Sequence, residues 1–263
     1  MSEHEIDVFG IKLGSQAYNE LISPAARALG SSLGKLASIV DKAVEATLFV
    51  ANISEDAARH LKARVLLECA KRDICRPVDP QPILLRKAVA GYAVSFDQDE
   101  LRSLYVRLIA RAMDETCSNS VHPAFVSVLN DFSPADALSI RSLHGFDEGQ
   151  KIIECVMINQ RPAREQVPIY IQWRNMCRKV GISDEDVADV SLDVMIRNGI
   201  VLRETSYHSH STPGTMVDEI NRNYVNKHID TLRMSSFGSR FVSLVCTDGE
   251  KSPNKSFETN GST

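Results

Sequence analysis

Two stretches of sequence decide the fold of this chain: LDVMIRNGI at residues 192–200 and LRMSSFGSRF at residues 232–241. The first is typical of a helix that ends at Asn-Gly and continues into an apolar strand, because glycine readily adopts a left-handed cap. The second is typical of a strand that runs into a Ser-x-Phe-Gly helix start, since serine is a favoured N-cap. Together they predict a winged-helix-like (α+β) end to the chain.

The residues before and between these two stretches supply the other elements of the winged-helix-like domain. We expect a helix that Ser133 caps, a strand at 151–158, a helix at 168–180 that stops at Gly181, and a helix that starts at Ser183, ends at Gly199 and carries its acids where the helix dipole favours them. Wing strands are expected at 200–205 and 231–234, followed by a last helix. The single tryptophan, Trp173, is expected to pack this domain. The order helix, strand, helix, helix, strand, strand, helix is that of a winged helix.

The first half of the chain has helical periodicity throughout. Apolar residues recur at three- and four-residue spacing in five segments: 17–53, 55–73, 83–93, 101–113 and 124–129. Asp97 and Glu100 have the spacing of a capping box for the fourth segment. Pro77, Pro80 and Pro82 predict a stiff connector, because proline fixes the backbone and cannot continue a helix.

These patterns predict a mainly α protein with an N-terminal helical domain followed by a winged-helix-like domain. The expected division is a leader at 1–14, an all-helical domain at 15–131, the winged-helix-like domain at 132–247 and a disordered polar tail at 248–263.

Composition is that of an ordinary globular protein. Of the 263 residues, 43% are apolar, and the net charge of −4 gives no general attraction for phosphate or anionic lipid. The six cysteines form no C-x-x-C pair, which indicates reduced core residues in a cytoplasmic protein. The start, MSEHEID, is acidic where a signal peptide is basic, and no apolar run is long enough for a conventional transmembrane helix.

Small side chains recur every fourth residue in the first predicted helix, at Ala26, Gly30, Gly34 and Ser38. Glycine costs ~1 kcal/mol relative to alanine in a helix interior, so the pattern requires an offsetting gain. Close approach of another helix is that gain, either within the domain or in self-association. Membrane insertion is a third interpretation, which the charges of the same helix oppose.

The predicted third helix of the winged-helix domain is acidic. Residues 184–197 hold five Asp/Glu against Arg197, a net of −4, and residues 133–247 hold 13 Lys/Arg against 14 Asp/Glu, a net of −1. Phosphates would be repelled by such a helix. Four cations near the wing are the candidates for nucleic-acid contact: Arg203, Arg222, Lys227 and Arg233. We expect an interaction or dimerisation module in preference to a DNA reader.

No catalytic or cofactor motif occurs. The sequence contains no glycine-rich phosphate loop, no G-x-S-x-G and no H-E-x-x-H, so no enzyme activity and no cofactor are expected. His208 and His210 would point the same way on a strand, but two histidines without a third ligand do not close a metal site. A solvated wing tip is the simpler interpretation.

Four segments resemble the bacterial abortive-infection alpha family: LISPAARALGSSLG at 21–34, ELRSLYVRLIARAMD at 100–114, HPAFVSVLNDFSPADA at 122–137, and the region from NGIV at 198 to FGSRFV at 237. One departure is Ser235, where the usual residue of the family is threonine. The resemblance implies a role in phage defence, in which an infected cell stops growing or dies before virus is released. It implies no catalytic residues.

Three hypotheses follow. The first is a non-enzymatic phage-defence protein that acts through a protein partner or as a homo-oligomer. The second is a DNA-binding winged-helix regulator. The third is an effector that associates with the membrane when active and disturbs it with the helix at 17–53.

Overall fold

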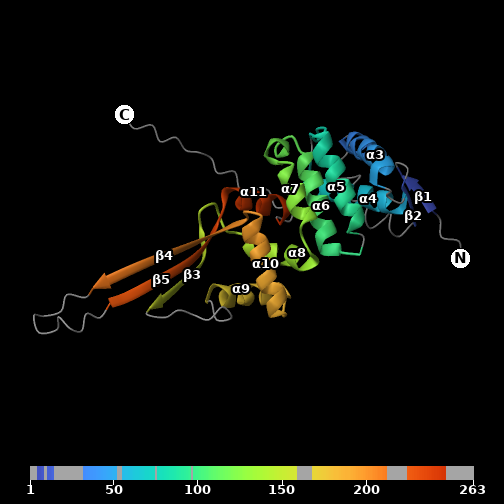
Figure 1. Ribbon diagram of the computed structural model, residues 1–263. Helices are drawn as coiled ribbons and strands as arrows, with labels where there is room; N and C mark the ends of the chain where they lie inside the picture. The colour runs from blue at the N-terminus through green and yellow to red at the C-terminus, as the bar shows by residue number, and fades with distance from the viewer. Residues whose placement is uncertain are drawn as a thin grey trace, which may run out of the picture.

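The computed structural model of the chain is mainly helical and carries a small three-stranded antiparallel sheet (Figure 1). The structure describes the following residues: 5–8, 11–14, 32–51, 55–74, 76–95, 97–158, 168–211 and 224–246. The predicted tail at 248–263 lies outside them, as does the first part of the predicted helix at 17–53.

The first half is a set of packed helices: α3 (Ser32–Ala51), α4 (Glu55–Lys71), α5 (Pro82–Val94), α6 (Asp99–Ala112) and α7 (Ala124–Asn130). The helix α6 lies against α4, α5 and α7, and its Leu104 and Leu108 are fully buried. All five predicted helices of this half are therefore confirmed within the described residues. A fully buried leucine contributes about 1.5–3 kcal/mol, so α6 anchors the helical part.

The capping box predicted at Asp97 and Glu100 was wrong. The helix α6 begins at Asp99, and its N-cap is Gln98, whose side chain makes no capping hydrogen bond. Glu100 is therefore the second residue of the helix, one short of the position from which a capping-box acid bonds back. Asp99 is engaged elsewhere, accepting a hydrogen bond of 3.2 Å from Arg64 of α4.

The leader contains a hairpin that was not predicted. The strands β1 (Glu5–Val8) and β2 (Ile11–Gly14) pair in antiparallel register. Strands of four residues offer too few alternations for periodicity to detect.

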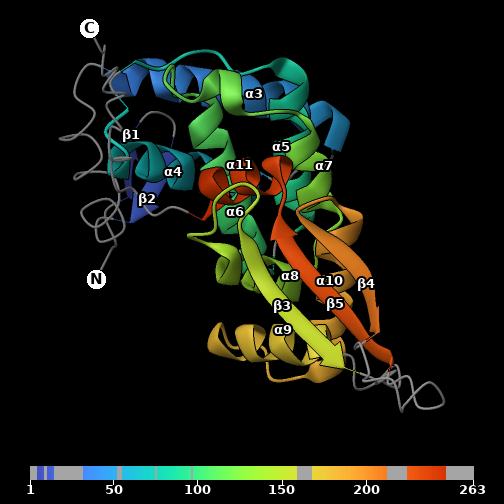
Figure 2. The same cartoon turned by 90° about the vertical axis from the view of Figure 1, so that its left-hand side faces the viewer.

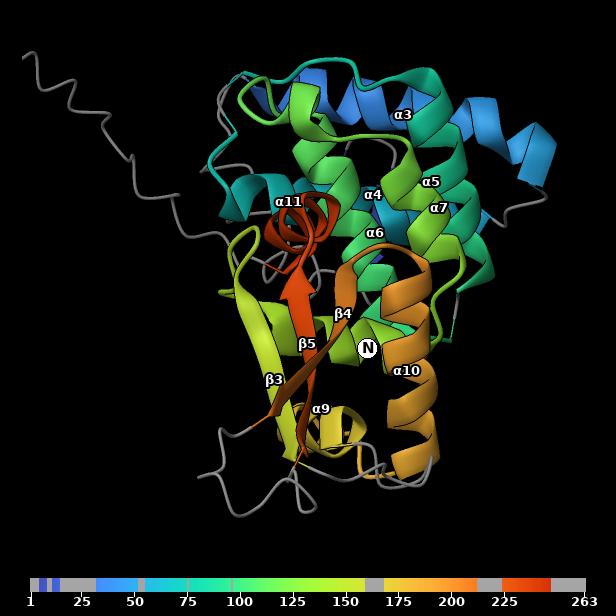
Figure 3. The ribbon, with the colours of Figure 1, turned by 60° about the vertical axis from the view of Figure 1, so that its left-hand side comes forward.

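The second half surrounds the sheet. Its elements are α8 (Pro134–Ser139), a 3₁₀ turn η3 (Ile140–Leu143), β3 (Lys151–Ile158), α9 (Pro168–Lys179), α10 (Glu185–Arg197), β4 (Val201–Ser211), β5 (Tyr224–Met234) and α11 (Ser236–Val245). The sheet order is β3-β5-β4, with antiparallel pairs throughout. Figures 2 and 3 show α8, α9 and α10 on one face of this sheet.

The hairpin of β4 and β5 is longer than predicted. Each strand has 11 residues, and the pairing runs without a register shift from Val201–Met234 to Ser211–Tyr224. The outer residues include several serines and histidines, and they lack the apolar alternation on which the strand prediction depended. In Figure 1 this hairpin projects beyond the helices.

Helix starts in the second half are set by local side chains. Ser133 caps α8 as predicted: its hydroxyl accepts from the Asp136 amide (3.3 Å), and its own amide donates to the Asp136 carboxylate (2.8 Å). The start of α10 is one residue later than predicted. Its cap is Asp184, which accepts from the Val187 amide at 3.1 Å, so Ser183 lies outside the helix.

The two stretches that decide the fold meet directly. Gly199 has a φ of +68°, the left-handed conformation predicted for it. The Ser235 hydroxyl accepts from the Gly238 amide at 2.7 Å and donates to the Ile200 carbonyl at 3.0 Å. A Cβ added to Gly238 would lie 2.0 Å from the Ile200 carbonyl oxygen. Only glycine therefore lets α11 approach the start of β4 this closely.

A single hydrophobic cluster extends through both halves of the chain. The helix α11 joins them, since its buried Phe241 lies 5.4 Å from the Phe125 ring of α7. Arg107 of α6 also donates a 2.9 Å hydrogen bond to the Val245 carbonyl. The division of the chain at residue 131 stays a prediction, and the halves on either side of it share one core.

Candidate functional site

The acidic residues of α10 hold this helix against α9. Glu185 and Asp189 lie one turn apart, and Arg174 of α9 reaches both. Its guanidinium donates to Asp189 through two nitrogens (2.7 and 2.5 Å) and to Glu185 at 2.6 Å. The hydrogen bonds to Asp189 raise the pKa of Arg174 above its ordinary value. The charge of α10 therefore stabilises the helix pair.

Two further contacts continue this arrangement along α10. Arg178 donates to Glu185 at 2.7 Å, and the Tyr170 hydroxyl donates to Asp193 at 2.7 Å. Burial of the Tyr170 phenol, followed by its bond to Asp193, raises its pKa. The helix α10 with its cap Asp184 has a net charge of −4. Because α9 carries three Lys/Arg, the two helices together have a net charge of −1. The exposed side of α10 includes Val187 and Val190.

The four predicted nucleic-acid cations do not form one surface. Arg222 lies outside the described residues. Arg203 points toward the helices, whereas Lys227 and Arg233 lie on the opposite face of the sheet, because residues alternate along a strand. Arg233 donates to Glu204 at 3.0 Å and to the Gly149 carbonyl at 3.3 Å. Nucleic-acid contact at these residues stays a prediction.

Arg203 belongs to a half-buried ion pair that the sequence did not predict. Its guanidinium donates through two nitrogens to Asp230 (3.0 and 2.5 Å), whose side chain is fully buried in β5. The hydrogen bonds to Asp230 raise the pKa of Arg203. Arg203 also lies 5.6 Å from the centre of the Tyr170 ring, so the pair connects the sheet to α9.

A second polar network is buried among the helices. Arg102 of α6, whose residue is 5% exposed, donates to the Tyr92 hydroxyl at 2.6 Å and lies 2.7 Å from His60 Nδ1. Its guanidinium also stacks 4.6 Å from the Tyr92 ring centre. Burial, followed by the nearby charges of Arg102 and Arg64, lowers the pKa of His60. His60 is therefore neutral and accepts from Arg102 at Nδ1.

The predicted ridge of small residues is only partly described. Ala26 and Gly30 lie outside the described residues, whereas Gly34 and Ser38 lie on the exposed side of α3. A Cβ added to Gly34 would meet no heavy atom within 4 Å, so none of the described helices packs closely on it. The role of this ridge in helix packing or self-association stays a prediction.

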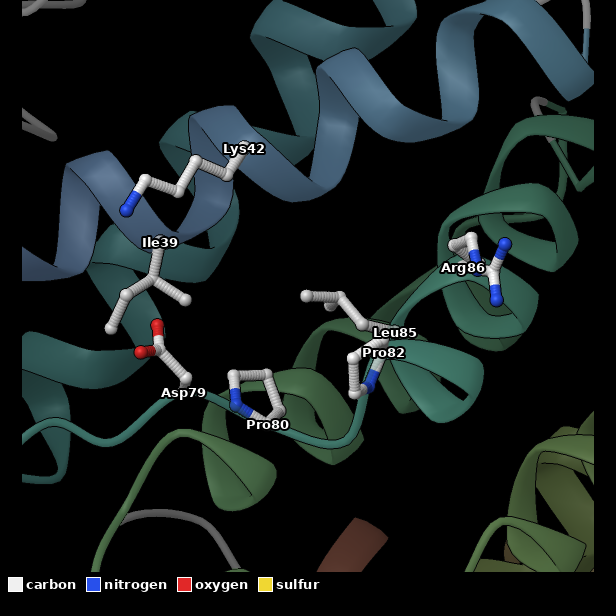
Figure 4. Close-up of a pocket in the computed structure, with 7 residues that line it drawn as sticks. All are labelled: Ile39, Lys42, Asp79, Pro80, Pro82, Leu85 and Arg86. Atoms are coloured by element: carbon white, nitrogen blue, oxygen red, sulfur yellow. The ribbon is translucent and has the colours of Figure 1, made fainter.

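A cavity of about 500 Å³ lies between α3 and the start of α5 (Figure 4). Its lining residues are Ile39, Lys42, Asp79, Pro80, Pro82, Leu85 and Arg86. Pro80 and Pro82 form part of its wall, where proline fixes the backbone of the connector. Apolar walls with one carboxylate and two cations suit an apolar ligand that carries a charged group. From the sequence, the prolines indicated only a connector.

The described part of the chain contains neither a cluster of metal ligands nor a membrane-spanning helix. There, no three His, Cys, Asp or Glu side chains gather as a metal ion would require. His208 is exposed on β4, and the side chain of His210 is outside the description. None of the helices, over the same residues, is both long and apolar enough to cross a bilayer.

Comparison with known families decides the relationship of the chain. The family model described as abortive infection alpha matches residues 52–246. The chain belongs to the abortive infection alpha family. The match covers every element from α4 to α11, so α3 and the β1–β2 hairpin precede the matched region. Neither a curated protein nor a solved structure shows a significant match to the chain.

Proposed function

We propose that this protein defends bacteria against phage by abortive infection, acting in the cytoplasm without enzymatic chemistry, through protein contacts or self-association. The observation that carries the role is the family match over residues 52–246. A family match indicates the biological role, and the mode of action rests on the surfaces described above.

We further propose that residues 132–247 form a winged-helix-like module. The order α8, β3, α9, α10, β4, β5, α11 and the sheet order β3-β5-β4 support this assignment. In a winged helix that reads DNA, the helix equivalent to α10 enters the major groove. Here α10 presents Val187 and Val190 beside acidic residues, which favours a protein partner over a duplex.

The alternative of a DNA-binding regulator rests on the cations of the hairpin. Arg203 is paired with Asp230 and Arg233 with Glu204, and both pairs would have to open before these guanidinium groups reached phosphates. An electrophoretic shift at low salt tests the alternative. DNA binding would be favoured if the protein shifts the DNA and the double variant Lys227→Ala, Arg233→Ala does not. This variant leaves the ion pair of Arg203 with Asp230 intact.

The proposed role is tested by infecting bacteria that express the protein at two ratios of phage to cells. When few cells are infected, early death of those cells limits spread and the culture survives. When every cell is infected, the culture collapses despite the protein. A culture that survives at both ratios points to another kind of defence, and plaque counts unchanged across a broad phage panel contradict the role.

The matched control is a variant that is still expressed but does not fold. Gly238→Val serves, because a side chain at Gly238 collides with the Ile200 backbone. This variant should give no protection, whereas Arg240→Ala, an exposed change in the same helix, should protect like the wild type. Immunoblots of both variants establish that the comparison is made at known protein levels.

A further inference from the structure

The strand β4 is a long edge strand of the sheet. The order β3-β5-β4 places it outermost, and it pairs with β5 over all of its 11 residues. Every residue from Leu202 to His208 is exposed. Of the elements that the structure describes, Figures 1 and 2 show no helix or further strand along the outer edge of its outer half.

The hydrogen bonds at the base of the sheet show which groups of β4 face outward. Met234 bonds toward β3, through the Gly149 amide and the Gln150 carbonyl (both 2.9 Å). Backbone groups alternate along a strand, so the odd-numbered residues of β5 bond to β4, and their partners there are even-numbered. The odd-numbered residues Arg203, Thr205 and Tyr207 therefore point their amides and carbonyls to the open edge.

Among the described residues, none supplies β4 with the usual protections of an edge strand. Proteins block such edges with proline, a bulge, an inward-pointing charge or a covering element. Residues 201–211 contain no proline, and the pairing with β5 has no register shift. The inward charge of Arg203 is neutralised by Asp230. The other edge strand differs, because β3 has a register shift between Lys151 and Ile153.

We propose that β4 pairs in antiparallel fashion with β4 of a second copy of this chain, about a two-fold axis at Ser206. The inference specifies the self-association in the proposed function and rests on it. The pairing joins two three-stranded sheets into one continuous sheet. It satisfies the outward amides and carbonyls of both edges, as in other complexes formed by strand addition.

Cross-strand side-chain pairs favour this register, and charge excludes two of its neighbours. Residues opposite each other have numbers that add to 412, so Glu204 faces His208 of the second copy, and Thr205 faces its Tyr207. In the first pairing an imidazole N–H can donate to the carboxylate, and the second brings an aromatic ring against a β-branched side chain, which is favourable across strands. An axis at Arg203 or Glu204 would instead place two like charges opposite each other.

Disulfide trapping of the full chain tests the register. Ser206 bonds to β5, so at the axis the two copies form a pair without mutual hydrogen bonds, with Cα atoms about 4.5 Å apart. That separation suits a disulfide. We expect Ser206→Cys to give a covalent dimer under mild oxidation. Leu202→Cys is the matched control, since it is exposed on the same face yet the axis separates its two copies by eight residues, about 27 Å.

Sedimentation of charge variants tests the pairing without a cross-link. Ser206→Lys and Ser206→Glu each place like charges opposite at the axis and should weaken self-association by about fivefold. Mixing the two variants should restore dimers, because unlike charges then face each other. Wild-type protein that sediments as a monomer, or equal cross-linking at residues 202 and 206, overturns the proposal.

These readouts separate the pairing from the phage role. A monomeric protein that still protects cultures disproves the strand pairing and leaves the defence role standing. A protein that dimerises through Ser206 but fails to protect supports the pairing and contradicts the defence role.

Discussion

Two buried charged side chains, Arg102 of the helical part and Asp230 of the sheet part, are stabilised in different ways. Among the helices, Arg102 is surrounded by the Tyr92 phenol and the neutral ring of His60, with Asp99 3.8 Å away on an exposed carboxylate. In the sheet, Asp230 is held by the full charge of Arg203. One network depends on a protonation state, and the other depends on an ion pair.

The difference shows what each part can tolerate. A change of pH acts on the helical network, because a protonated His60 would repel Arg102. In the sheet pair, the hydrogen bonds to Asp230 raise the pKa of Arg203, so the charge of this guanidinium does not change near neutral pH. Losing either member of the sheet pair should therefore cost more than altering His60.

The largest effect is expected where the two parts are joined. Gly238→Ala puts a methyl group 2.0 Å from the Ile200 carbonyl, so backbone must move and α11 must shift from both parts. Overpacking of this kind costs about 3 kcal/mol. Urea denaturation measures the loss, with the exposed Arg240→Ala as control. A Gly238→Ala variant within about 0.5 kcal/mol of wild type would contradict the close approach.

The second effect concerns the sheet pair. Arg203→Met leaves Asp230 buried without its guanidinium and should lower the free energy of unfolding by about 2 kcal/mol, less than for a fully buried pair because Arg203 is 30% exposed. The double variant with Asp230→Leu should recover most of this loss, since no buried charge remains. Equal losses in the single and double variants would mean that the ion pair is not the source.

Local signals explain why the sequence predicted the junction but not the ion pair. Gly199 and Ser235 act within a few residues of themselves, so a left-handed cap and an N-cap could be recognised from the pattern alone. Arg203 and Asp230 are 27 residues apart, and their contact requires the exact register of a hairpin whose outer half has no apolar alternation. The second predicted wing strand began at residue 231 and so left out Asp230, which hid the pair.

The cavity beside α3 was unpredictable for a related reason. Pro80 and Pro82 indicate an extended connector, but its distance from α3 depends on how three separate segments pack. The number of acidic residues in α10 is correct from the sequence alone. The sequence did not indicate that two of them are paired, because their partner Arg174 lies on another helix. In each case the feature that could not be predicted is a contact between segments that are distant in the sequence.

A smaller effect of opposite sign is expected at Gly34 on the exposed side of α3. Alanine there meets no neighbouring atom and favours the helix, so Gly34→Ala should raise the free energy of unfolding by about 0.5–1 kcal/mol. Sedimentation of Gly34→Leu and of Ser206→Lys then shows whether the protein self-associates through α3 or through β4. Loss of dimers in the α3 variant alone would favour the small-residue ridge.

The smallest change at neutral pH is expected for His60→Gln, whose effect is a change of pH dependence. The pKa of folded His60 lies below 6.5, so the unfolded chain binds a proton that the folded chain excludes. Stability from this group is complete above pH 6.5 and is lost as the pH falls through the lowered value. Glutamine can accept from Arg102 without titrating, so the variant should lose less stability between about pH 7 and pH 5. Urea midpoints across that range measure the slope, and parallel slopes for variant and wild type would show that His60 does not set the acid response.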